Sequence, residues 1–264
     1  EGMDDEGFEV LANEMRVASS LDHPYLIAFK GFYISDTAAC CLVFEYAGGG
    51  TLQQIIDKHA RRKAEEEYED DESDSSFKRR QEREGRAGFE TAVIRNWILQ
   101  MSKALIYMHE RRVVHRDVKA SNIFLSNDLT TTKLGDFGIS KVMTSVSSAG
   151  HTVCGTPSYM CPEVLRGEGC GPPGDVWALG VVLFQLLALR VPFKPPAHAH
   201  AYALMMLITK FDGTLDEDAT LAIESCGHPD ALRRLASGGS MLHPQPTERT
   251  ALEEVVAVLE AVTE

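Results

Sequence analysis

Three polar side chains near the middle of the chain have the types and spacing needed to bind a divalent cation and to orient a hydroxyl group. Asp117 and Asn122 are five residues apart, and Asp136 follows Asn122 by 14 residues. Carboxylate and amide oxygens are ligands that magnesium prefers in proteins, and a carboxylate can also accept a proton from a hydroxyl group. These residue types therefore make the three side chains candidates for metal binding and for accepting a proton.

The segments that contain these residues resemble the signature motifs of eukaryotic protein kinases. Val114–Ile123 matches the catalytic-loop pattern H-R-D-x-K-x-x-N, and Leu134–Gly138 contains D-F-G. Gly155–Glu163 then reads G-T-P-S-Y-M-C-P-E, with C-P-E where the family usually has A-P-E. The order and separation of these segments identify the chain as a member of the Ser/Thr protein kinase family. The residues in and around these motifs are most similar to those of the NIMA-related (NEK) kinases.

The resemblance implies that the chain transfers a phosphoryl group from ATP to a protein hydroxyl with the help of Mg²⁺. Asp117 would accept the hydroxyl proton, and Asn122 and Asp136 would hold the metal ion. Lys119 would contact the transferred phosphate, and a lysine at this position is typical of Ser/Thr kinases. Thr156 resembles the threonine that bridges the catalytic aspartate and lysine.

The same resemblance implies structural and nucleotide-binding roles for other residues. Glu163 and Arg249 would pair to anchor the end of the activation segment. Asp175 would hold the backbone of the catalytic loop, and a role as the N-cap of its helix is compatible with this one. The resemblance also implies structural roles for His115 in the catalytic loop and for Phe137 in D-F-G.

For the adenine base, Phe44 would be the gatekeeper, and backbone groups at Glu45 and Ala47 would form the hinge contacts. The alternative is that Phe44 and Tyr46 are core aromatics at the end of a strand.

The activation segment carries the expected regulatory residues. Thr152 is the expected phosphorylation site, and its phosphate would contact Arg116 and Lys141. An upstream kinase or autophosphorylation would add this phosphate. The resemblance also implies a preference for threonine over serine in the protein substrate, because in this family a β-branched residue directly after D-F-G, here Ile139, goes with that preference.

Hydrophobic patterning and the resemblance together predict a two-lobed α+β kinase fold with a mostly helical C-lobe. Residues 1–46 would be a partial N-lobe, with a helix over Phe8–Leu21 and strands within Tyr25–Ile34 and Cys40–Tyr46. Residues 47–57 would form the hinge and a following helix. Residues 58–90 are densely charged and are predicted to be a disordered insert, either solvated or regulatory. Residues 91–264 would form the C-lobe, with one helix from Thr91 and an apolar helix from Asp175.

The glycine-rich loop and strand lysine of kinases are not found before Glu14, which has the spacing of the helix glutamate that such a lysine pairs with. We therefore expect a truncated N-lobe, a fragment of a longer kinase, and little or no activity of this chain alone. The alternative is a kinase-shaped scaffold without a nucleotide clamp.

The composition restricts the partners and the compartment. A net charge of −13 disfavours binding to nucleic acid. The longest apolar run falls short of a bilayer span, so no membrane association is expected. The six cysteines lack C-x-x-C spacing and are interpreted as reduced thiols. A cytoplasmic location is expected, with the nucleus and the cytoskeleton as alternatives.

Overall fold

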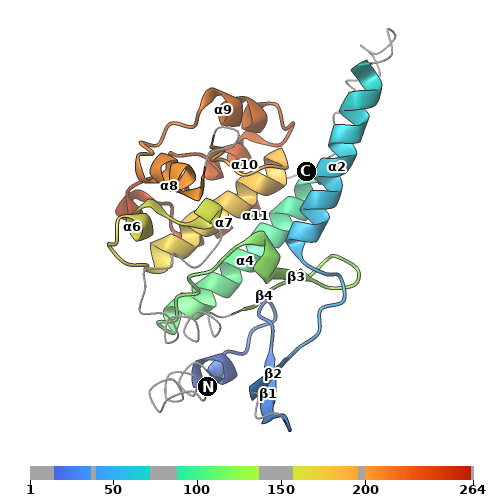
Figure 1. Ribbon diagram of the computed structural model, residues 1–264, viewed down its shortest axis with the longest axis vertical. Helices are drawn as coiled ribbons and strands as arrows, with labels where there is room; N and C mark the ends of the chain where they lie inside the picture. The colour runs from blue at the N-terminus through green and yellow to red at the C-terminus, as the bar shows by residue number, and fades with distance from the viewer. Residues whose placement is uncertain (1–14, 37–39, 72–87, 137–156, 196–199, 263–264) are drawn as a thin grey trace.

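The computed structural model describes residues 15–36, 40–71, 88–136, 157–195 and 200–262. A small part with two strands lies at one end, and a larger part made mostly of helices lies at the other (Figure 1). This arrangement confirms the predicted α+β class with a helical C-lobe. Among the described residues, no helix is both long and apolar enough to cross a membrane.

The small part consists of a helical turn and a β-hairpin. Residues 15–20 are helical, and β1 (Phe29–Ile34) pairs with β2 (Cys40–Phe44) in antiparallel fashion. Ala18 on the helical turn is buried against Phe29, Leu42 and Phe44. Both strands fall inside the predicted segments, whereas the first half of the predicted helix lies outside the described residues.

Helix α2 (Leu52–Asp71) is longer than the sequence predicted. Its first turns are held by Leu52 and Ile56, which are each 1% exposed. The helix then continues through the first part of the segment assigned to a disordered insert, so the boundary at residue 57 is wrong. Alanine, glutamate, lysine and arginine are strong helix formers, and opposite charges four residues apart, such as Arg61 and Glu65, add support. Figure 1 shows α2 reaching away from the other helices.

The C-terminal end of the predicted insert is also structured. Phe89 is 7% exposed, and its ring lies 4.2 Å from that of His59 and 5.4 Å from that of Trp97, measured between centroids. Burying an aromatic ring of this size stabilises the fold substantially. Phe89 therefore belongs to the core and not to the insert.

Two long helices form the centre of the large part. Helix α4 (Thr91–Glu110) buries the predicted face, which includes Ile94, Trp97 and Met101. Helix α7 (Pro172–Ala188) is buried on nearly all sides, because α4, α9 (Glu217–Glu224) and α10 (Asp230–Leu235) pack against it. It begins three residues before the predicted start, since Pro172 and Pro173 suit the first helical positions.

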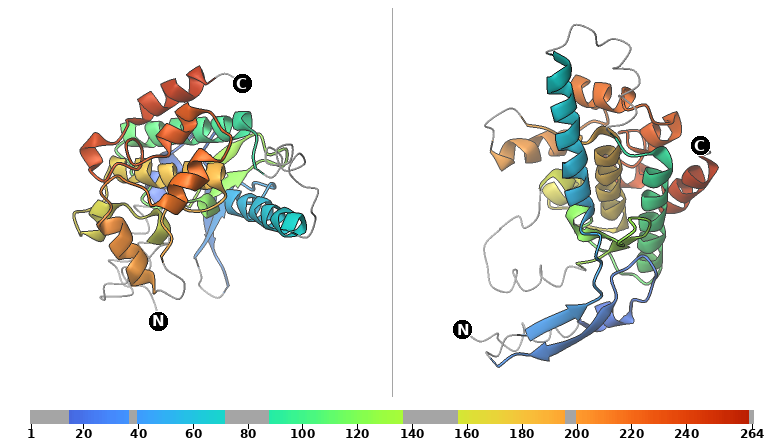
Figure 2. Two further views of the ribbon diagram at one scale, coloured as in Figure 1. Left: turned by 90° about the horizontal axis from the view of Figure 1, so that it is seen from above. Right: turned by 90° about the vertical axis from the view of Figure 1, so that its right-hand side faces the viewer.

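The remaining helices cover this centre, as the two views of Figure 2 show. Helix α11 (Leu252–Ala261) packs against α4, and α6 (Pro162–Leu165) packs against α8 (Ala201–Thr209).

A second β-hairpin connects the two parts. Strands β3 (Ile123–Leu125) and β4 (Thr132–Leu134) are antiparallel, with Ile123 opposite Leu134. Ile27 N–H donates to the carbonyl of Leu134, and Leu134 N–H donates to the carbonyl of Tyr25, both over 2.9 Å. The chain segment that leads into β1 is thereby fixed to the strand that leads to Asp136.

Candidate active site

Asp117, Lys119 and Asn122 form one hydrogen-bonded cluster directly before β3. Lys119 Nζ lies 2.9 Å from Asp117 Oδ2, and Asn122 Nδ2 donates to the same oxygen over 3.1 Å. Asn122 Nδ2 also donates to the backbone carbonyl of Asp117 over 2.9 Å. Since these bonds occupy the amide nitrogen of Asn122, its amide oxygen remains as the group for a cation.

The β3–β4 hairpin brings Asp136 to the same end of the site as Asn122. Asn122 immediately precedes β3, and Gly135 and Asp136 immediately follow β4, whose last residue lies opposite Ile123. Gly135 N–H donates to the carbonyl of Asn122 over 2.9 Å. Asp136 is exposed and has a φ of 62°, an uncommon conformation for a residue other than glycine.

Gly135 is required by packing at this point. A Cβ at this position would lie 2.9 Å from Ile27 Cγ1 and 3.0 Å from Phe124 Cε2. A side chain here would therefore force a shift of the Ile27 and Phe124 side chains or of the backbone that carries them. The close approach therefore fixes the strand end from which Asp136 projects.

His115 is a buried link between the catalytic loop and Gly135. Its Nδ1 accepts a hydrogen bond from Asp117 N–H at 3.3 Å, so its Nε2 carries the proton and donates to the Gly135 carbonyl at 3.0 Å. Burial lowers the pKa of His115, and the nearby Asp175 opposes this shift. Through these two hydrogen bonds the imidazole holds the loop in position.

Asp175 lies beneath the catalytic loop and accepts hydrogen bonds from its backbone. Its Oδ2 accepts from His115 N–H and its Oδ1 from Arg116 N–H, both over 2.9 Å. The side chain is 1% exposed. Because Gly171 is the N-cap of α7, the additional helix-capping role expected for Asp175 is wrong.

His109 near the end of α4 also contacts Asp175, with Nε2 2.8 Å from Oδ2. The sequence analysis missed this residue. His109 and Asp175 are 66 residues apart, and neither spacing nor composition indicates the contact.

Glu163 and Arg249 form a buried, bidentate ion pair. Arg249 Nη1 and Nη2 donate to the two carboxylate oxygens of Glu163 over 2.6 and 2.7 Å. Burial works to raise the pKa of Glu163, but the hydrogen bonds from Arg249 hold that pKa below its ordinary value. Arg249 Nη1 also donates to the carbonyl of Pro173, so the pair ties α6 to the start of α7.

The predicted hinge contains an ion pair that the sequence analysis missed. Lys133 Nζ on β4 lies 2.8 Å from Glu45 Oε1, and Glu45 Oε2 accepts from Ala28 N–H at 3.2 Å. Partial burial works to raise the pKa of Glu45, but the hydrogen bonds from Lys133 and Ala28 lower it overall. Phe44 is half-buried beside Phe29, with ring centroids 5.5 Å apart, and Ala47 is half-buried. Phe44 thus packs as a core aromatic, whereas Tyr46 is 89% exposed, so the core interpretation is wrong for Tyr46. The gatekeeper role of Phe44 stays a prediction.

Arg116 is exposed and adopts a φ of 65° directly before Asp117. The other predicted site residues lie outside the described residues: Glu14, Phe137, Lys141, Thr152 and Thr156.

The donor set at the end of the β3–β4 hairpin fits magnesium. Amide and carboxylate oxygens from Asn122 and Asp136 are the ligands that this ion takes. Within the described part of the chain, no cluster of three or more His, Cys, Asp or Glu side chains could hold a metal ion. Phosphate and water oxygens would therefore have to complete the coordination, as is common for Mg²⁺ beside a nucleotide.

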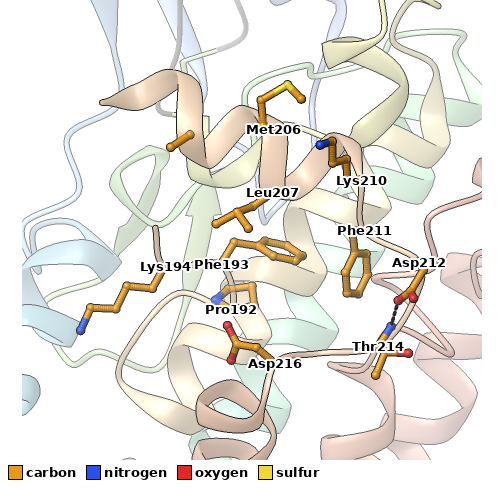
Figure 3. A pocket seen from close by; sticks show the side chains of 11 residues that line it. Pro192, Phe193, Lys194, Met206, Leu207, Lys210, Phe211, Asp212, Thr214 and Asp216 are labelled. Carbon is orange, nitrogen blue, oxygen red and sulfur yellow. Dashed lines mark hydrogen bonds between the residues drawn. The ribbon is translucent and has the colours of Figure 1, made fainter. Parts of the chain in front are cut away.

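A cavity of about 460 Å³ lies away from this cluster, beside α8 (Figure 3). Its wall includes Phe193, Leu207 and Phe211, and the rings of Phe193 and Phe211 are 5.0 Å apart. None of the predicted site residues lines it.

The fold and this arrangement of residues are those of a kinase domain. The family model for the protein kinase domain matches residues 1–258, and the chain belongs to that family. It is 32% identical to Serine/threonine-protein kinase Nek3 of Oryza sativa subsp. japonica, over 92% of this chain and 35% of that protein. It is also 32% identical to Nek8 of Danio rerio, over 93% of this chain and 29% of that protein. These similarities confirm a NEK-like Ser/Thr kinase domain, which spans about a third of the length of these relatives.

The fold is also similar to that of a solved kinase. The crystal structure of Rad53 residues 1–466 in complex with AMP-PNP aligns with a TM-score of 0.69 at 22% identity, covering 96% of this chain and 55% of that one. This similarity supports the kinase fold.

Proposed function

We propose that the protein containing this chain transfers the γ-phosphoryl group of ATP to a serine or threonine hydroxyl of a protein substrate. The cluster of Asp117, Lys119 and Asn122, placed beside the strand end that carries Asp136, is the observation that supports this proposal. Phosphoryl transfer requires mainly positioning and charge neutralisation, and this cluster supplies oxygen and ammonium groups for both.

Each side chain has one task in this proposal. Asp117 accepts the proton of the substrate hydroxyl, and Lys119, 2.9 Å from Asp117, neutralises negative charge on the transferred group. Asn122 and Asp136 hold Mg²⁺, which would neutralise charge on the ATP phosphates when bound. Asp175 and His115 fix the loop backbone so that Asp117 keeps its direction.

A kinase assay of the full-length protein with Mg²⁺ and ATP tests this proposal. Asp117→Asn is expected to lower kcat by at least ~100-fold, the scale of a lost general base. Asp230→Asn is the control, because Asp230 lies on α10 with a side chain that is 61% exposed. Equal activity of wild type and Asp117→Asn, or no phosphorylation of any protein by the wild type, would refute the proposal.

We also propose that the substrate site does not select arginine before the acceptor residue. Kinases that select arginine before the acceptor place a glutamate within the helix that follows Asp175, where this chain has Gln185. Gln185 is 6% exposed; its Oε1 accepts from Tyr159 OH at 2.6 Å, and its Nε2 donates to Gln53 Oε1 at 3.2 Å. A neutral side chain with its groups already bonded offers no charge for an arginine. A peptide array would check this preference, together with the proposed preference for threonine that Ile139 implies.

The remaining expectations stay proposals. We propose a cytoplasmic location and activation by an upstream kinase or by autophosphorylation. Imaging of the tagged full-length protein, and phosphosite mapping with and without the Asp117→Asn change, would test them.

A further inference from the structure

Cys161 and Cys170 lie next to each other where α6 and α7 begin. Cys161 is the N-cap of α6, and Cys170 directly precedes Gly171, the N-cap of α7. A Cβ placed on Gly174 would be 2.9 Å from Cys170 Sγ and 3.3 Å from Cys161 Sγ. Both sulfur atoms therefore lie beside the same point of the backbone, where Gly174 has no side chain.

The two thiols differ in exposure and in acidity. Cys161 is 3% exposed, whereas Cys170 is half-buried. The neighbouring Cys161 thiol lowers the pKa of Cys170, and the neighbouring Cys170 thiol, together with burial, raises the pKa of Cys161. Because the thiolate is the reactive form, Cys170 is the thiol that reacts first with an oxidant. Cys161 then reacts with the oxidised Cys170 to form the disulfide.

We propose that Cys161 and Cys170 are a reversible disulfide site that is closed by hydrogen peroxide and opened by cellular thiols. The Cys170 thiolate attacks one peroxide oxygen, the O–O bond breaks, and the released hydroxide takes up a proton to become water. Cys161 sulfur then attacks Cys170 sulfur, the S–O bond breaks, and the hydroxide leaves with the Cys161 proton as a second water. The two sulfurs lose two electrons, which reduce the peroxide. In a reducing compartment such a bond is transient.

The bridge would join two segments that the active site depends on. Cys161 is the N-cap of α6 and lies two residues before Glu163, the partner of Arg249. Cys170 lies five residues before Asp175, which holds the backbone of His115 and Arg116. Oxidation of Cys161 and Cys170 would therefore affect two features of the site. One is the Glu163–Arg249 ion pair, and the other is Asp175, which holds the backbone of the catalytic loop.

Peptide mapping of the full-length protein after treatment with hydrogen peroxide tests the proposal. Trypsin cleaves after Arg166, between the two cysteines, so a disulfide keeps two peptides joined until dithiothreitol is added. Cys154 lies on the same tryptic peptide as Cys161, since neither lysine nor arginine occurs between them. The variants Cys161→Ser, Cys170→Ser and Cys154→Ser separate the two possible bridges.

The linked peptides are expected in wild type and Cys154→Ser, and they should be absent in Cys161→Ser and Cys170→Ser. Alkylation by iodoacetamide without peroxide is a second measurement that needs no variant. Cys170 should react faster than Cys226, a half-buried thiol whose pKa is raised by burial, by about tenfold for each pKa unit between them. The proposal is overturned if peroxide-treated wild type contains no linked peptides, if the link survives Cys161→Ser, or if Cys170 reacts no faster than Cys226.

Discussion

Glu163 and Arg249 are 86 residues apart in sequence, and both are almost completely buried when they form their two hydrogen bonds. A buried charge that loses its partner keeps its desolvation cost without the compensating attraction. This pair therefore connects the end of the activation segment to the C-terminal part of the fold, and removing one partner should be far more costly than removing an exposed ion pair.

Arg249→Ala is expected to lower the free energy of unfolding by about 3–5 kcal/mol, because it leaves Glu163 charged and buried. Urea unfolding followed by circular dichroism measures this change. Lys103→Ala is the control, since Lys103 pairs with Glu260 at the surface, where side chains are 43% and 55% exposed. That change should cost at most about 1 kcal/mol. Equal losses for the two variants would contradict the importance of the buried pair.

Stability should fall as the pH drops below 6.5, the ordinary pKa of histidine, in part because of His115. Burial lowers the pKa of His115 in the folded state, so between the two pKa values the unfolded chain binds the proton more strongly. The contribution of this residue is therefore complete above pH 6.5 and is lost as the pH falls toward the folded-state pKa. The slope for one such group is at most ~1.4 kcal/mol per pH unit.

Urea unfolding from about pH 7 to about pH 5, where histidines titrate, would measure this slope. The His115→Asn variant should give a shallower slope than wild type. His228, whose pKa is also lowered by burial, provides the comparison through His228→Asn. If His115→Asn leaves the slope unchanged, the histidine does not supply this pH dependence.

The Glu45–Lys133 ion pair is partly exposed, with side chains 28% and 22% accessible, so solvent screens much of its energy. A double-mutant cycle with Glu45→Gln and Lys133→Met is expected to give a coupling of about 0.2–1 kcal/mol in urea unfolding. The coupling should decrease at high salt, because ions screen exposed charges. A coupling that persists unchanged at high salt would show that the pair is shielded from solvent in solution.

Thr152→Ala in the full-length protein is expected to lower kcat by at least ~10-fold, because the phosphate that would order the activation segment through Arg116 is lost. Thr144→Ala, in the same segment, is the control. Mass spectrometry of the active protein would show whether Thr152 carries phosphate. Wild-type turnover in Thr152→Ala would reject Thr152 as the switch.

Sequence patterns correctly predicted those features that depend on residues close together in the chain. The apolar spacing from Ile94 to Met108 indicated the buried face of α4, and the catalytic-loop spacing indicated the cluster of Asp117 with Asn122. By contrast, the contact of Lys133 with Glu45 joins residues 88 apart and depends on how the two hairpins pack. No sequence spacing specifies such a contact.

The two boundary errors have physical reasons as well. Dense charge was interpreted as disorder, but the charges of α2 are of both signs and sit on residues that favour helix, so the helix continues to Asp71. The predicted start of α7 is Asp175, whereas the helix begins at Pro172, because prolines are well accommodated in the first turn of a helix.

The backbone hydrogen bonds of Tyr25 and Ile27 to Leu134 restrict how the small part can rotate relative to the helical part. On the return path of the chain, Gly49 N–H is bonded to the carbonyl of Leu125, so both crossings are anchored to the second hairpin. A rocking movement of the β1–β2 hairpin must therefore pivot between these anchors, near Ala28 and Glu45, which are bonded to each other. Such a movement would first change the distance between Glu45 and Lys133. The strand that ends at Asp136 would not move relative to the helical part.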